Sequence, residues 1–216
     1  MSEHEPQSAE EWDERYSGEQ LWSGRPNQAL VAEASELSPG RALDVGCGEG
    51  ADAVWLAQRG WQVTALDISP KAVQRTESAA ARAGVAVEGV ASGLVDASLD
   101  DASYDLVSAM YFVLLRTPTR EAERRLLDLV RPGGTLLVVH HADLDQDHDH
   151  DHDHGHDQES TFRLEDYVTP DDVRVAAVER GGWEVVVDER RERGPVEGAG
   201  AHHHSDLVVR LTRTPH

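Results

Sequence analysis

The chain has 216 residues, a length that suits one domain. Its 41 Asp and Glu against 20 Lys and Arg give a formal charge of −21. This charge repels nucleic acid and anionic membranes, because proteins bind both by neutralising phosphate groups. No apolar run approaches the ~20 residues that cross a bilayer, and the acidic, polar N-terminus lacks the pattern of a secretory signal. With Cys47 as its single cysteine the chain has no intramolecular disulfide framework, and we expect a cytoplasmic protein. The negative charge favours a small neutral or cationic molecule as partner, and both a monomer and a homodimer are compatible with the sequence.

Strands and helices are predicted to alternate along most of the chain. Short apolar runs closed by glycine or an acid indicate buried strands, and a capping residue followed by proline indicates a helix start. In chain order we expect a helix over 28–37 capped by Asn27, a strand at 41–45, a helix at 51–59, a strand at 61–66, a helix at 70–83 capped by Ser69, strands at 85–91 and 104–110, a helix at 119–130 opened by Thr117, a strand at 135–140, a helix at 173–180 after the Thr169-Pro170 cap, and strands at 183–187 and 206–211.

This alternation predicts an α/β fold, a doubly wound, mostly parallel seven-stranded sheet with a C-terminal antiparallel hairpin. Residues 1–26, polar with scattered aromatics, are expected to form an arm that packs onto the domain at 27–216. Within that domain, 143–160 is expected to be a flexible loop, because acids and imidazoles alternate at 147–157 and offer no apolar face to a core.

The most informative stretch is the glycine-rich turn LDVGCGEG at 43–50. Glycines directly after a strand allow a ligand to approach the backbone, as at the first crossover of doubly wound sheets. A nicotinamide site usually has G-x-G-x-x-G facing a pyrophosphate, whereas here the spacing is G-x-G-x-G with Asp44 two residues earlier. A carboxylate suits the ammonium group of S-adenosylmethionine (AdoMet). The spacing therefore favours AdoMet over a nicotinamide cofactor.

Asp67 is the second candidate cofactor residue. It ends the second predicted strand, 21 residues after Gly46, where a carboxylate can accept hydrogen bonds from both ribose hydroxyls. The alternative is that Asp67 only helps to cap the helix that starts near Ser69.

With these motifs the chain resembles the class I AdoMet-dependent methyltransferases, specifically the small methyltransferase-domain group with tellurite-resistance-type relatives. The resemblance runs from about residue 12 to 142 and more weakly to the C-terminus. The segments that carry it are WDERY at 12–16, LWSGRPN at 21–27, the turn at 44–50, ALDIS at 65–69, YDLV at 104–107 and RPGG at 131–134. It implies a Rossmann-like fold and AdoMet as the methyl donor, but does not specify the acceptor.

The resemblance also implies roles for particular residues. The methionine part of AdoMet is expected at Gly46, Cys47, Gly48 and Gly50, and the ribose at Asp67 beside Ile68. Where the family often has an acid for the adenine amine, this chain has Ser92-Gly93-Leu94, so Ser92 or backbone groups are expected there, with Asp96 as second candidate. In the arm, Arg25 is expected to pair with the AdoMet carboxylate and Trp12 or Tyr16 to cover the sulfonium, against the alternative of ordinary packing.

The predicted acceptor side holds a pair of histidines at the end of the fifth strand. A hydroxyl acceptor needs a base or a metal to remove its proton, and an imidazole can serve. We predict His140 or His141 as that base, with only one of the two facing the pocket. His141 and Asp143 could together hold a divalent ion, Mg²⁺ or Zn²⁺, and Tyr111 could line the site. The alternative is a polar strand end exposed to water.

Three functions follow for comparison. The preferred one is a small-molecule methyltransferase with a hydroxyl acceptor, such as a sugar or another polar alcohol. Within the same class, a thiol or a tellurite- or selenite-type metalloid acceptor would need little help from the histidines. In a different class, the chain would be a metal-binding protein that acts through the Asp/His run at 147–157.

Overall fold

The structure is a computed structural model, and it describes residues 8–142, 166–194 and 203–215. Among these residues, no helix combines the length and apolar character needed to cross a membrane. The strands are β1 (Arg41–Val45), β2 (Gln62–Asp67), β3 (Val87–Ala91), β4 (Tyr104–Met110), β5 (Val130–His141), β6 (Trp183–Glu192) and β7 (Ser205–Arg213). The helices are α1 (Ala9–Arg15), α2 (Gln28–Ala34), α3 (Ala51–Gln58), α4 (Pro70–Ala83), α5 (Glu121–Leu129) and α6 (Pro170–Arg180).

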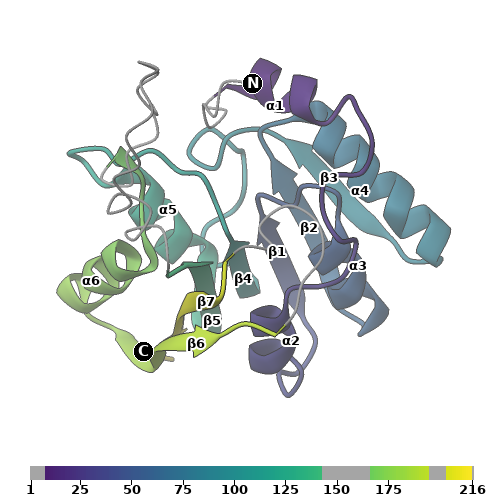
Figure 1. The fold of residues 1–216 in the computed structure, drawn as a ribbon. Helices are drawn as coiled ribbons and strands as arrows, with labels where there is room; N and C mark the ends of the chain where they lie inside the picture. Colours follow the sequence, from purple (N-terminus) through teal and green to yellow (C-terminus); the bar gives the residue numbers. More distant parts are fainter. Residues whose placement is uncertain (1–7, 143–165, 195–202, 216) are drawn as a thin grey trace, which may run out of the picture.

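The strands form one seven-stranded sheet in the order β3-β2-β1-β4-β5-β7-β6 (Figure 1). Neighbours from β3 to β5 pair in parallel. β7 is inserted between β5 and β6 and pairs antiparallel with both. The predicted mostly parallel seven-stranded sheet with an antiparallel C-terminal hairpin is therefore confirmed.

Helices cover both faces of the sheet, because alternate strand residues point to opposite sides. Leu43 and Val45 belong to a core with α5 and α6, whereas Ala42 belongs to a second core with α2 and α3. α4 packs beside α3 and against β2 and β3, as Figure 1 shows on the right of the view. β1 and β4 are parallel, so their carboxyl ends lie at the same edge of the sheet. The strand order reverses between these two strands, and ligands bind at such a position in doubly wound sheets.

Several predicted boundaries were wrong, for local reasons. Residues 9–15 of the arm form α1 with a Ser8–Glu11 capping box, a helix that we do not predict from the sequence. Asn27 occupies the N-cap position of α2, but its side chain makes no capping bond and instead donates to Asp52 at 2.7 Å; α2 also ends at Ala34 rather than at residue 37. Helix α5 starts two residues late, at Glu121, because Arg120 has a left-handed conformation.

Candidate functional site

The glycine turn joins β1 to α3 as an open backbone surface. The N–H groups of Gly46 and Cys47 both donate to the Leu66 carbonyl, at 2.8 and 3.0 Å, which fixes the turn against the end of β2. Gly46 has φ +73°, a left-handed conformation, and a Cβ added there would meet no atom within 4 Å. The backbone at Gly46 thus has room beside it for a ligand group.

The other two glycines of the turn are needed by the protein itself. A Cβ on Gly50 would lie 2.8 Å from the Cα of Thr76, so α3 and α4 can pack closely only with glycine here. A Cβ on Gly48 would lie 3.1 Å from the hydroxyl of Tyr16 and 3.3 Å from Nε1 of Trp22, both in the N-terminal arm. The turn is therefore open at Gly46, packed on α4 at Gly50 and covered by the arm at Gly48.

Asp67 points into this turn, as the proposed ribose role requires. Its Oδ2 accepts from the Gly48 N–H at 3.0 Å and its Oδ1 from the Ser69 N–H at 2.9 Å. Burial raises the pKa of this carboxyl, and the two N–H groups oppose that shift. The bond to Ser69 shows that the helix-start contact exists as well. The carboxylate therefore connects the turn with the start of α4.

Asp44 is a buried acid directly beneath the turn. Its Oδ1 lies 3.4 Å from the Ser108 hydroxyl, whereas its Oδ2 is buried and has no hydrogen-bond partner among the described residues. Burial, and then the negative charge of Asp52, raise the pKa of the Asp44 carboxyl. An unpartnered buried carboxylate oxygen is costly unless a ligand satisfies it. A cationic ligand group, such as the AdoMet ammonium, fits this position.

The region where adenine is expected combines an exposed apolar side chain, Ile68, with polar groups at Ser92. Ile68 is 37% exposed, an unusual position for an isoleucine, and the Ser92 N–H donates to the Asp67 carbonyl at 2.9 Å. Leu94 has its side chain in the core, so only its backbone remains for ligand contact. Asp96 folds back toward Gly93, where an added Cβ would lie 3.5 Å from Oδ2.

The arm is held on the domain by two sets of polar contacts. Near α1, Asp13 accepts from the Ser69 hydroxyl and from the Lys71 N–H. Further along, Glu49 of the turn accepts from the N–H groups of Leu21 and Trp22 at 2.9–3.2 Å. Thus the turn itself binds the backbone of the arm that covers it.

Arg75 completes this attachment from α4. It forms an ion pair with Glu49 and also donates to the carbonyls of Gly18 and Glu19. We name Glu49 and Arg75 the arm latch. Of the predicted arm residues, Trp12 stacks on Tyr16 with ring centroids 5.7 Å apart, and the buried Tyr16 hydroxyl accepts from Trp22 Nε1 at 3.2 Å.

Arg25, the third predicted arm residue, lines a pocket of about 100 Å³ between the arm and the sheet edge. The pocket is lined by Ser23, Arg25, Pro26, Asn27, Gln28, Tyr111, Arg193 and Asp206. Its wall mixes polar and apolar surface, and it brings the arm together with residues that follow β4 and β6 and with Asp206 of β7.

His140 is half-buried at the end of β5. Its Nδ1 accepts from the N–H of His141 at 2.9 Å, and its ring packs edge-on against Phe112 at 5.8 Å between centroids. Burial, with the neighbouring His141, lowers the pKa of His140 to about 4. This imidazole is therefore neutral near pH 7 and a weak base.

His141 lies in a cluster with Tyr111, Arg193, His203 and Asp206, which we name the acceptor-side cluster. The His141 ring stacks between Tyr111 and His203, with centroid distances of 4.3 and 3.8 Å. Its Nδ1 lies 3.4 Å from Asp206 Oδ1. Tyr111 also has a left-handed φ of +52°, a strained conformation for an aromatic residue.

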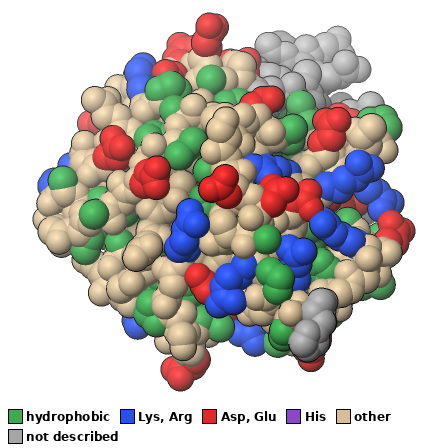
Figure 2. All heavy atoms as spheres, turned by 180° about the vertical axis from the view of Figure 1, so that it is seen from behind, with side chains coloured by type: hydrophobic (Ala, Val, Ile, Leu, Met, Phe, Trp, Pro, Cys, Tyr) green, Lys and Arg blue, Asp and Glu red, His purple; other side chains and the backbone are tan. Residues whose placement is uncertain are grey.

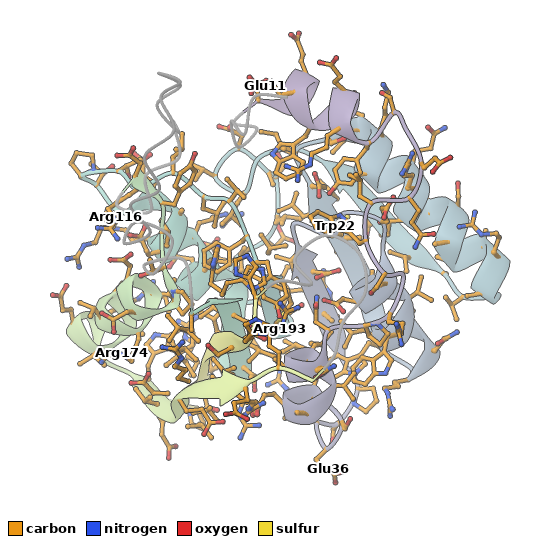
Figure 3. All side chains as sticks on the ribbon, in the orientation of Figure 1. Glu11, Trp22, Glu36, Arg116, Arg174 and Arg193 are labelled. Atoms are coloured by element: carbon orange, nitrogen blue, oxygen red, sulfur yellow. The ribbon has the colours of Figure 1, made fainter. Side chains whose placement is uncertain are left out.

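Two members of this cluster, Arg193 and Asp206, were missed in the sequence. Asp206 accepts from the Tyr111 hydroxyl at 2.8 Å and pairs with Arg193 at 3.4 Å. In Figure 3 Arg193 lies at the centre of the view, whereas Arg116, Arg174 and Glu36 lie at the periphery. No local motif marks either residue, because their place in the site depends on the pairing of β7 with β5.

The predicted metal site is not supported within the described residues, where no group of three or more His, Cys, Asp or Glu side chains could hold a metal ion. Asp143 and the Asp/His run at 147–157 lie outside those residues. The metal role of His141 with Asp143 therefore stays a prediction.

Residues 42–134 match the family described as "Methyltransferase domain". Over these residues the chain is similar to methyltransferase domains. The match begins in β1 and ends in β5, so it includes the glycine turn and Asp67. The predicted resemblance and fold are therefore confirmed for this domain.

Curated relatives of the methyltransferase domain have different named substrates. The chain is 33% identical over 124 residues to ribosomal RNA small subunit methyltransferase C of Alcanivorax borkumensis (54% of this chain, 38% of the relative). It is 35% identical over 122 residues to an uncharacterised methyltransferase of Mycobacterium bovis (56% and 61%), and 31% identical over 109 residues to the ubiquinone biosynthesis O-methyltransferase of Xanthomonas euvesicatoria (50% and 46%). The matches span about half the length of these relatives.

Solved structures share the fold over nearly the whole chain. One, from a study of the conversion of a disulfide bond into a thioacetal group during echinomycin biosynthesis, has a TM-score of 0.71, 23% identity and coverage of 96% of this chain and 92% of the other. The N-methyltransferase NodS of Bradyrhizobium japonicum, with S-adenosyl-L-homocysteine, has a TM-score of 0.66, 20% identity and coverage of 95% and 97%. At these identities the likeness establishes the fold alone.

Proposed function

We propose that the chain is an AdoMet-dependent methyltransferase that acts on a small molecule, with a hydroxyl as preferred acceptor. The observation that carries the proposal is the glycine turn, where the backbone at Gly46 is open, Asp67 binds the Gly48 N–H, and Asp44 Oδ2 has no hydrogen-bond partner among the described residues. Asp44 would receive the ammonium and Asp67 the ribose hydroxyls, with Arg25 at the AdoMet carboxylate. AdoMet supplies an activated methyl group on its sulfonium.

The chemical step asks the protein mainly to align donor and acceptor and to exclude water. A hydroxyl acceptor must also lose its proton. Of the two predicted bases we assign this role to His141, because the low pKa of His140 makes it a poor proton acceptor and its Nδ1 is engaged by the chain itself. His140 then orients the strand end from which His141 projects.

A small acceptor is favoured over nucleic acid by electrostatics. The formal charge is −21, and phosphate backbones bind proteins through neutralisation by Lys and Arg. On the face in Figure 2, basic and acidic side chains are intermixed. This differs from the continuous basic surface expected of an RNA-modifying enzyme, although a ribosomal RNA methyltransferase is among the relatives.

The first test is calorimetry of the purified chain with S-adenosylhomocysteine (AdoHcy) and, separately, NAD. We expect AdoHcy to bind and NAD not to bind; the absence of AdoHcy binding would remove the proposal. Turnover is then measured against sugars, polyols and phenols, with and without Mg²⁺. Thiols, selenite and tellurite form a second panel, since one structural neighbour comes from a study of sulfur chemistry, and ribosomal RNA forms a third.

The metal-binding alternative is tested separately with Zn²⁺ calorimetry on the full chain and on a variant that lacks 147–157. Loss of tight Zn²⁺ binding together with unchanged methyl transfer would make the segment peripheral to catalysis. Loss of both would make the metal part of the reaction.

A further inference from the structure

We propose that Asp206 is a positioning residue, which holds His141 in the tautomer with its proton on Nδ1 and so places the basic lone pair on Nε2. This inference rests on the proposed function, in which His141 removes the acceptor proton. It concerns a residue that lies outside the matched domain at 42–134 and outside the sequence motifs.

The sheet brings the two residues together. His141 and Asp206 are direct partners in the antiparallel pairing of β5 with β7, so their side chains leave the same face of the sheet side by side. Asp206 is 5% exposed. A carboxylate at this depth must have donors for both oxygens, or its burial destabilises the fold.

The donors of Asp206 divide between its two oxygens. Oδ2 accepts from the Tyr111 hydroxyl at 2.8 Å and lies 3.4 Å from Arg193 Nε. Oδ1 lies 3.4 Å from Nδ1 of His141, which among the described contacts is the donor available to this oxygen. If the imidazole carried its proton on Nε2 instead, Oδ1 would face a lone pair, which is repulsive. The carboxylate therefore favours the Nδ1–H form.

Arg193 competes for the same nitrogen. Its Nη1 lies 3.4 Å from His141 Nδ1, and a guanidinium can only donate, so this contact favours the opposite tautomer. Arg193 has other acceptors within reach, namely Asp206 Oδ2 and the His203 carbonyl. Oδ1 of Asp206 has no such alternative donor among the described residues. The contact with Asp206 therefore determines the tautomer, and His141 has its proton on Nδ1.

The proton and electron balance of the step is simple. The acceptor oxygen forms a bond to the methyl carbon while the S–C bond breaks, and that electron pair neutralises the sulfonium to give AdoHcy. The hydroxyl proton moves to Nε2 of His141, and the resulting imidazolium is stabilised by Asp206 before it releases the proton to water. Stacking on Tyr111 and His203 holds the ring plane.

The test is the tautomer of His141 in the full chain, labelled with ¹⁵N-histidine and observed by long-range ¹H–¹⁵N correlation at about pH 8.5, where imidazoles are neutral. The His141→Gln spectrum assigns the signal. We expect Nδ1–H for His141 in the native chain. His140 is an internal reference, expected as Nε2–H because its Nδ1 accepts from a backbone N–H.

Asp206→Asn should invert the tautomer. The amide oxygen is retained by its two donors, Tyr111 and Arg193, so the NH₂ group faces His141 Nδ1, which must then accept. The matched control is Glu33→Gln, another buried acid that pairs with Arg191 and Arg210 away from the cluster; it should leave both imidazole signals unchanged. With a hydroxyl acceptor in hand, we expect Asp206→Asn to lower kcat by about 10²–10⁴-fold, the range of base catalysis and of a wrong tautomer.

Two results would overturn the proposal: Nε2–H for His141 in the native chain, or an unchanged His141 tautomer in a folded Asp206→Asn variant. The first needs no variant, so misfolding of Asp206→Asn cannot hide the answer. AdoHcy calorimetry separates this proposal from the proposed function. A chain that binds AdoHcy but has the wrong tautomer loses only the role of Asp206, whereas a chain that does not bind AdoHcy loses the enzyme assignment.

Discussion

The glycine turn and the acceptor-side cluster lie at the same edge of the sheet but are built differently. The turn uses backbone: open space at Gly46, the Gly48 N–H, and two short acids, all within residues 44–67. The cluster uses long side chains from four separate segments, which meet only when β7 inserts between β5 and β6. A backbone site suits one fixed ligand, whereas a side-chain site can change its specificity by single substitutions. The comparison explains why the methyl donor is evident and the acceptor is not.

The largest expected effect is on the turn side. Asp67→Ala removes a carboxylate expected to accept two ribose hydrogen bonds, each worth about 1.5–3 kcal/mol when charged, so AdoHcy affinity should fall about 100-fold. The measurement is calorimetry, with thermal unfolding in parallel. The exposed Asp100→Ala is the control and should bind normally. If Asp67→Ala binds AdoHcy as tightly as the native chain, the glycine turn is not the site that binds the methyl donor.

On the acceptor side, His140 should make stability depend on pH. Its folded pKa, about 4, lies below the usual value of 6.5, so the unfolded chain binds the proton more readily between these values. The stability that the neutral His140 imidazole contributes to the folded chain is therefore fully present above pH 6.5 and is lost as the pH falls toward 4. His140 should contribute about 2 kcal/mol to the free energy of unfolding by this route, which is less than its whole pKa difference would give, because the side chain is only half-buried.

Denaturant unfolding of native and His140→Gln chains between pH 4 and 8 tests this. The stability difference between the two chains should grow with pH across that window and then level off. A constant difference would mean that His140 titrates normally. The buried acids Asp44 and Asp67, whose pKa values are raised, act in the opposite direction but are common to both chains and cancel.

Within the turn, two alanine substitutions should separate binding from folding. Both Gly46→Ala and Gly50→Ala force a side chain into a left-handed backbone, at a cost of about 1 kcal/mol. Only Gly50→Ala also meets the Thr76 backbone at 2.8 Å. We expect the greater loss of Tm in Gly50→Ala and, in Gly46→Ala, about a tenfold loss of AdoHcy affinity, close to 1.4 kcal/mol, with the smaller loss of Tm. Equal losses of Tm would contradict this.

The smallest effect concerns the arm latch. Glu49→Gln removes the ion pair with Arg75 but keeps an oxygen that can accept from the arm backbone. Partly exposed ion pairs contribute about 0.5–1 kcal/mol, so AdoHcy affinity should fall about threefold to fivefold and proteolysis of the arm should accelerate. Glu14→Gln on the outer side of α1 is the control. If both variants behave alike, the arm does not depend on the latch.

The contrast between the two regions also explains what the sequence could predict. Residues 44–67 follow one another as a strand, a glycine turn, a helix and a second strand. Spacing alone therefore predicts that Asp44 and Asp67 end near the turn at Gly46, where the structure has them. The cap signals at Ser69 and Thr169 are equally local, and both side chains cap their helices. Helix α4 starts where predicted, whereas α6 starts at Pro170, directly after its cap and three residues before the predicted 173–180. Local chemistry is readable without knowledge of the tertiary structure.

Asp206 and Arg193 could not be found in this way. Their role depends on the pairing register of β7 with β5, which places Asp206 opposite His141, and nothing in the neighbouring sequence specifies that register. The predicted capping role of the Asn27 side chain was wrong for a related reason. The side chain has the right chemistry for a cap, but a buried carboxylate 25 residues away, Asp52, binds it more favourably. Long-range partners override local preference in both cases.

Tyr111 illustrates a cost that this arrangement imposes on the molecule. Its left-handed backbone is unfavourable for any residue with a Cβ, by about 1–2 kcal/mol. Replacement by glycine or asparagine would relieve that strain and, by the same substitution, remove the ring on which His141 stacks. Glycine would also remove the hydroxyl that donates to the buried Asp206, and a buried carboxylate that loses a donor destabilises the fold by about 1–3 kcal/mol. The relief of strain is therefore offset, and a library sorted only by thermal survival should keep tyrosine at this position.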